Sequence, residues 1–119
     1  MEWQTDPVFV VLRATGPDPV DDAVVHFAAS SFVGGAERVV VPAQWMRPPD
    51  DPEGLLLPRR NHLEWTADDL VELPDSGERF PECLADLAGC FVVLPAGRDD
   101  FLARWRAHGR GEPPVVVDL

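Results

Sequence analysis

An apolar run near the start of the chain, Val8–Gly16 (VFVVLRATG), constrains the fold more than any other segment. Its residues up to Leu12 are continuously apolar, which is typical of a central strand that is buried on both faces. Gly16 and the Pro-Asp-Pro sequence that follows it end the strand. We therefore expect the other elements to be arranged around this strand in one sheet.

Two further strands are predicted before residue 42. An extended apolar segment, Ala23–Phe32, ends near Gly34 and Gly35, and Glu37–Val41 follows directly. A Gly-Gly pair between two such segments is a strong signal for a β-hairpin. The first three strands are therefore expected to form an antiparallel meander, in which His26 is a solvent-facing or cross-strand residue rather than a catalytic one.

Residues 42–60 are rich in Pro and Gly, which predicts a long loop without an extended regular element. Trp45 and Met46 are expected to pack this loop against the domain. Arg59 and Arg60 are candidates for an anion site, although two adjacent arginines on a loop are more often solvated.

Helical patterns dominate the next part of the chain. Thr66, with Asp69 three residues later, has the form of a capping box and predicts a short helix. A longer helix follows, with Asp75 or Ser76 as its N-terminal cap and Gly89 at its C-terminal end. The apolar stripe of this longer helix consists of Phe80, Cys83, Leu84, Leu87 and Ala88.

The chain ends with a strand, a helix and a strand. We predict a buried strand at Cys90–Leu94, a helix at Arg98–His108 and a last strand at Val115–Leu119. The helix is expected to bury Phe101, Leu102 and Trp105. Strands joined through a helix usually run parallel. The expected fold is therefore α/β, with a mixed five-stranded sheet in which a three-strand antiparallel meander is followed by two parallel strands with crossover helices.

Length and composition favour a single cytoplasmic domain that spans residues 1–119. Apolar residues make up 45% of the chain, and no apolar run reaches the ~18 residues that a membrane-spanning helix needs. The N-terminus lacks the pattern of a signal peptide. Cys83 and Cys90 are too few for a disulfide framework and lie in apolar patterns, which favours buried free thiols.

The charge balance argues against nucleic acid as a partner. The chain has 21 acidic and 10 basic residues, which gives a formal net charge of −11. Binding to nucleic acid draws most of its affinity from the neutralisation of phosphates by Lys and Arg. A local basic groove, or a metal-dependent nuclease that is acidic overall, is still compatible with this charge.

The order of the expected elements is that of the ribonuclease H-like fold. More narrowly, the chain resembles the proofreading-type 3′–5′ exonucleases of the DEDD group. Those domains begin with an apolar strand that reads Asp-x-Glu-Thr-Thr-Gly at its end and is followed by Asp-Pro; residues 11–19 here read VLRATGPDP. Residues 95–100 (PAGRDD) stand where the family has His-Asn-x-x-Phe-Asp. The resemblance covers nearly the whole chain by register and spacing, with few identical residues.

The resemblance implies that the catalytic residues are lost. The family cleaves phosphodiesters with two divalent metal ions, held by two acids of the first strand and by further acids of later elements. Val11 and Arg13 stand at the two strand positions, and Asp100, next to Asp99, stands at the third. The chain ends before the family's C-terminal helices, which carry a His and a last Asp. Asp99 and Asp100 are therefore only weak metal candidates, and Mg²⁺ or Mn²⁺ is expected only for a divergent nuclease.

Three functions are compatible with these replacements. We favour a catalytically inactive, exonuclease-like module that acts as a protein-interaction or scaffolding subunit, either as a homodimer or bound to a protein partner, because sheet surface without the C-terminal helices should stay exposed and apolar. One alternative is a divergent 3′–5′ exonuclease that a partner completes. The other is an accessory protein that binds a nucleotide or a small anion. We expect an ion pair between Arg13 and Asp100 to fill the former metal site; the alternatives are a small anion or nucleotide bound there, or no contact between the two residues.

Overall fold

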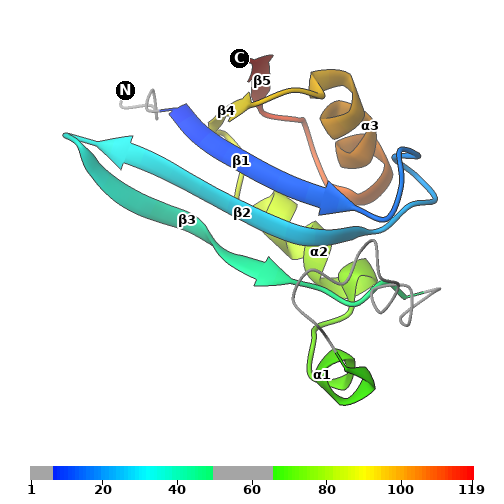
Figure 1. The fold of residues 1–119 in the computed structure, drawn as a ribbon. Coiled ribbons are helices and arrows are strands. Elements are labelled where there is room, and N and C mark those ends of the chain that lie inside the picture. The colour runs from blue at the N-terminus through cyan, green and yellow to red at the C-terminus, as the bar shows by residue number, and fades with distance from the viewer. Residues whose placement is uncertain (1–6, 50–65) are drawn as a thin grey trace.

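The computed structural model describes residues 7–49 and 66–119, which contain one five-stranded sheet (Figure 1). The strands are β1 (Pro7–Ala14), β2 (Val24–Val33), β3 (Ala36–Trp45), β4 (Phe91–Leu94) and β5 (Val115–Asp118). They lie in the order β3-β2-β1-β4-β5. β2 pairs antiparallel with β1 and β3, whereas β4 runs parallel to β1 and β5. The predicted α/β fold, with a meander followed by parallel strands in a ribonuclease H-like arrangement, is confirmed.

The hairpin between β2 and β3 depends on its two glycines. Gly34 and Gly35 have φ angles of 58° and 83°. A two-residue turn of type I′ requires positive φ at both positions, which glycine adopts without the steric cost that a Cβ brings. Val33 and Ala36 pair directly across this turn. The predicted hairpin is therefore confirmed at its predicted turn.

β3 is longer than the sequence pattern predicts. The predicted strand ends at Val41, whereas the pairing with β2 continues to Trp45, which lies opposite His26. Pro42 is tolerated because β3 is an edge strand, where one row of backbone groups needs no partner. The expectation of a loop was therefore wrong for residues 42–45. Met46 is completely buried and packs the chain onto the core, as expected, while the arginines at positions 59 and 60 lie outside the described residues.

In the described part of the chain, three helices accompany the sheet, at Ala67–Val71 (α1), Ser76–Ala85 (α2) and Arg98–His108 (α3). Thr66 and Asp69 form the predicted reciprocal capping box of α1. Asp75 caps α2, because its Oδ1 accepts a hydrogen bond of 2.8 Å from the N–H of Gly77. None of the helices in the described ranges has both the length and the apolar content that crossing a membrane would require.

The main hydrophobic core lies between the sheet and the two longer helices, which pack on the same face (Figure 1). The rings of Phe80 on α2 and Phe27 on β2 meet edge to face, with centroids 5.9 Å apart. Phe101 and Trp105 anchor α3 as predicted, and both are almost completely buried. Leu102 is only partly buried at the edge of the core.

The opposite face of the sheet is covered by neither α2 nor α3. Val8 and Val10 of β1 are each 1% exposed on the helix side, whereas Phe9 and Val11 are 37% and 49% exposed on the other side. The expectation that β1 is buried on both faces was therefore wrong, because the helices cover only one. We call the uncovered side the open face; among the described residues it carries the exposed apolar side chains of Phe9, Val11, Phe32, Val39, Phe91, Val115 and Val117.

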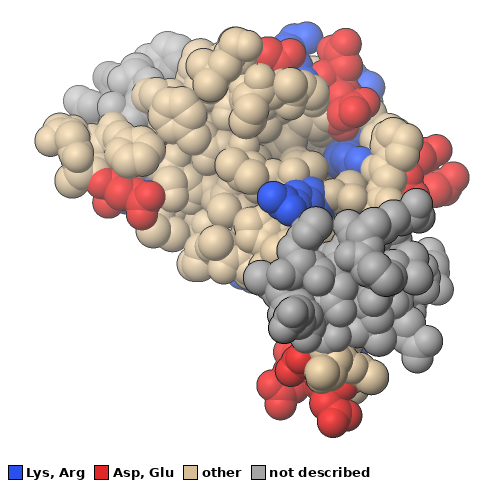
Figure 2. Space-filling view, viewed as in Figure 1, with Lys and Arg blue, Asp and Glu red and all other residues tan. Residues whose placement is uncertain are grey.

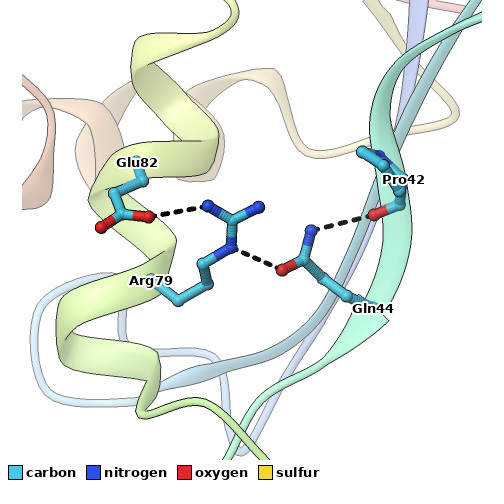
Figure 3. A network of polar contacts seen from close by, with 4 residues as sticks. All are labelled: Pro42, Gln44, Arg79 and Glu82. Carbon is cyan, nitrogen blue, oxygen red and sulfur yellow. Dashed lines mark hydrogen bonds and ion pairs between the residues drawn. The ribbon is translucent and has the colours of Figure 1, made fainter.

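A polar network ties α2 to the edge strand (Figure 3). Arg79 donates from Nε to Oε1 of Gln44 on β3 at 2.7 Å. Nε2 of Gln44 donates in turn to the backbone oxygen of Pro42 at 2.9 Å, and Nη1 of Arg79 pairs with Glu82 at 2.7 Å. The network thus holds β3 beside α2 near Pro42, whose backbone nitrogen has no hydrogen to donate.

Both cysteines are free thiols, as predicted. Cys83 is buried in the core, whereas Cys90 is only partly buried, so the expectation of burial was correct for the first and too strong for the second. Burial raises the pKa of both thiols, which keeps them protonated and unreactive near neutral pH.

We expect Leu84→Ala to lower the free energy of unfolding by about 2–5 kcal/mol, because it opens a cavity at a completely buried site of the core. Urea unfolding followed by circular dichroism measures this change. Leu119→Ala is the matched control, since that side chain is 83% exposed and its loss should change stability by less than about 0.5 kcal/mol. Equal effects of the two substitutions would contradict the assignment of the core.

Candidate functional site

A pocket opens where β1 and β4 separate. Within β1, only Pro7–Phe9 pair with β4, so no described strand lies beside the second half of β1 on that side. The space is filled in part by the turn after β4 and by the first turns of α3, which leave a pocket of about 280 Å³. It is lined by Val10, Val11, Leu12, Leu94, Pro95, Ala96, Gly97, Asp100, Phe101 and Arg104. In α/β sheets, ligands commonly bind at the carboxyl ends of strands where neighbouring strands diverge in this way.

Two of the three positions singled out by sequence meet at this pocket. Val11 and Asp100 both line it, whereas Arg13 does not. Arg13 is exposed on the open face, where it pairs across strands with His26. No ion pair joins Arg13 to Asp100, so this expectation was wrong. The physical reason is that Arg13 projects from the open face, whereas Asp100 lies on α3, which packs on the helix face.

The cation at the pocket is Arg104, a residue that the sequence interpretation missed. Arg104 is 3% exposed. Its Nη1 donates to the backbone oxygen of Asp22 at 3.1 Å, and its Nη2 donates to that of Gly16 at 3.3 Å. Burial lowers the pKa of Arg104, although the neighbouring carboxylates, Asp100 first, act in the opposite direction. A signal was present, because residue 104 follows Phe101 by three positions and therefore lies on the apolar stripe of its helix.

The connection between β1 and β2 is folded so that its backbone oxygens face Arg104. Asp18 accepts hydrogen bonds from the N–H groups of Val20 and Asp21, at 2.8 and 2.9 Å, and these bonds lower the pKa of its carboxyl group. Asp22 accepts from the N–H of Asp18 at 2.7 Å. A Cβ at Gly16 would collide with the Asp22 carboxylate, which explains why glycine stands there. Arg104 thus fastens this connection to α3.

The residues at the pocket do not fit a two-metal centre. Asp100 is the carboxylate that lines the pocket, and it lies beside the cationic Arg104. The side chain of Asp99 is 96% exposed and pairs with Arg98 at 3.4 Å instead. In the described parts of the chain, no group of three or more His, Cys, Asp or Glu residues could hold a metal ion. Two-metal hydrolysis would need further carboxylates at this pocket, whereas the structure has the buried guanidinium of Arg104 there.

His26 lies on the open face, in the cross-strand position that the sequence predicts. Its ring contacts that of Trp45, with centroids 4.6 Å apart. Its Nδ1 is buried without a hydrogen-bond partner among the described residues. Burial lowers the pKa of His26, and the charge of Arg13 lowers it further. The side chain is therefore held neutral as part of a packed surface.

The open face is the larger functional candidate. Figure 2 shows it as a mostly uncharged surface, with acidic side chains gathered toward its margins. Phe9 and Phe32 contact each other edge to face at 6.0 Å, and both rings stay partly exposed. Exposed apolar side chains on this face come from all five strands. Large exposed apolar patches are rare on monomeric proteins, and where they occur they generally mark interaction sites.

No protein-family model matches the sequence, and no curated protein matches it.

Replacing Arg104 by Met should lower the free energy of unfolding by about 2–4 kcal/mol, because two partly buried backbone oxygens lose a charged donor. Urea denaturation of the wild type and the variant measures the difference. Arg106→Met on the exposed side of the same helix serves as the control and should change stability by less than about 0.5 kcal/mol. The assignment of Arg104 is refuted if the two variants unfold at the same urea concentration.

The imidazole of His26 should titrate below its ordinary pKa of 6.5 in NMR spectra. Because the folded state disfavours the charged ring, this residue's contribution to stability is complete above pH 6.5 and declines as the pH falls below that value. Arg13→Met should raise the pKa of His26, since it removes the neighbouring positive charge. A titration of His26 that is identical in both proteins would exclude the influence of Arg13.

Proposed function

We propose that this chain is a catalytically inactive, exonuclease-like module that acts in the cytoplasm by binding protein through its open face. The observation that carries the proposal is the uncovered sheet face, on which apolar side chains of every strand are exposed. Leaving such a surface in water is unfavourable by about 25 cal/mol for each Å² that a partner could bury. Association with another protein surface would relieve this cost.

The chemistry of the pocket supports the absence of catalysis. Phosphodiester hydrolysis with two metal ions needs several carboxylates that converge on one point. Here Val11 has no oxygen that could bind a metal ion, and Asp100 lines the same pocket as the buried Arg104. The terminal nitrogens of that arginine donate to backbone oxygens of the β1–β2 connection. Its hydrogen bonds therefore serve the fold, which also speaks against the alternative of a small-anion site.

Incubation with labelled single-stranded DNA or RNA in Mg²⁺ or Mn²⁺ tests the proposal. We expect no release of nucleotides above the level of an Asp100→Ala variant. Asp99→Ala, at a fully exposed position, is the matched control. Release by the wild type that persists in Asp99→Ala but is lost in Asp100→Ala would establish the divergent-exonuclease alternative. Stabilisation against heat by nucleoside monophosphates would establish the nucleotide-binding alternative.

A further inference from the structure

We infer that the partner of the open face is a second copy of this chain, with Arg13 of each subunit paired with Glu37 of the partner subunit. The inference rests on the proposed function and names its occupant. It follows from the distribution of charge on the open face, which makes that face complementary to itself.

Arg13 and Glu37 lie at opposite ends of the open face. Glu37 pairs across strands with Phe32, and residues directly opposite in a ladder share a face. Phe32 contacts Phe9 on the open face, so Glu37 belongs to the same side. Arg13 pairs with His26. Because Phe32 and His26 are six residues apart on β2, the two charged groups are separated by about 20 Å.

Neither charge is neutralised within the described part of the subunit. No ion pair links Arg13 or Glu37 to another described side chain, and both residues are exposed. The surface between them carries apolar residues such as Phe9 and Val11. The described open face thus has Arg13 at one end, Glu37 at the other and apolar residues between them. In a second copy turned end to end, each charge would meet the opposite charge.

The symmetry of a homodimer brings these groups together. A two-fold axis in the plane of the interface, perpendicular to the line that joins Arg13 on β1 to Glu37 on β3, lays the hairpin end of one sheet over the β1 carboxyl end of the other. Each such dimer contains the same contact twice, as an isologous interface requires. Sheets packed face to face lie about 10 Å apart, a distance that the long side chains of Arg and Glu can span.

The size of the open face fits a weak dimer. Five strands cover about 19 Å across the sheet, and β1 with 8 residues extends over about 26 Å. The resulting flat area of roughly 500 Å² is below the about 600–1,000 Å² of accessible surface that each partner buries in a standard interface, which places this contact among the small, weak interfaces. Among the described residues, Figure 2 shows acidic side chains gathered toward the margins of this face and away from its centre.

Charge reversal tests the pairing through sedimentation equilibrium over a concentration series. Arg13→Glu alone and Glu37→Arg alone should each raise the dimer dissociation constant roughly tenfold, because two attractive contacts become repulsive. An equimolar mixture of the two single variants should form heterodimers with near-wild-type affinity, since every cross-subunit contact then joins opposite charges. A double variant that carries both reversals should also recover the affinity.

Matched controls separate this pairing from a general effect of charge. Arg106→Glu and Glu112→Arg change the net charge by the same amounts at exposed positions elsewhere, and they should leave the dissociation constant unchanged. Val39→Glu places a charge at an exposed position of the apolar surface on the edge strand and should abolish the dimer, with circular dichroism confirming that the fold is kept. A wild type that is monomeric at every concentration would overturn the inference. A dimer that is insensitive to Val39→Glu, or single variants that are not restored on mixing, would do so as well.

The two proposals can fail separately. A monomer without nuclease activity would refute the second copy as the occupant and leave the inactive module intact. A dimer that releases nucleotides in an Asp100-dependent way would refute the inactive module, whereas the charge-reversal result would still stand.

Discussion

Packing of both long helices on one face of the sheet is the constraint from which the rest of the architecture follows. Because side chains alternate along a strand, Val8 and Val10 enter the core while Phe9 and Val11 point away from it. The same alternation sends Arg13 to the open face and separates it from Asp100. One choice of face therefore determines the core, the pocket and the surface that is left for a partner.

Arg104 is a buried cation that stabilises the fold at the pocket, where metal-dependent hydrolysis would need carboxylates. Its guanidinium satisfies two backbone oxygens of the β1–β2 connection, one on each side of a tight Asp-rich turn. Burying a cation is unfavourable unless its donors are satisfied, and here the local carboxylates and carbonyls provide that compensation. At the pocket, the hydrogen bonds of Arg104 therefore connect α3 to the segment that follows β1. This structural role agrees with the proposed loss of catalysis.

Much of the fold is readable from local patterns. Apolar segments mark the centres of all five strands. The Gly34-Gly35 turn, the Thr66 capping box and the Asp75 cap are set by interactions between residues close in sequence, and such interactions leave clear signatures. Errors arose where a distant element decides the outcome. Pro42 fits within β3 only because that strand is at the sheet edge, and the outer side of β1 is bare only because no helix of the described chain packs there.

The candidate sites divide along the same line. Sequence alone determined that the first strand carries Val11 and Arg13, neither of which offers a carboxylate to a metal ion, because the identity of a side chain is independent of the fold. Only the tertiary structure decided that Arg104 is the buried cation and that Arg13 and Glu37 share one face. Contacts between residues far apart in the chain arise from packing, and packing joins partners that no local pattern connects.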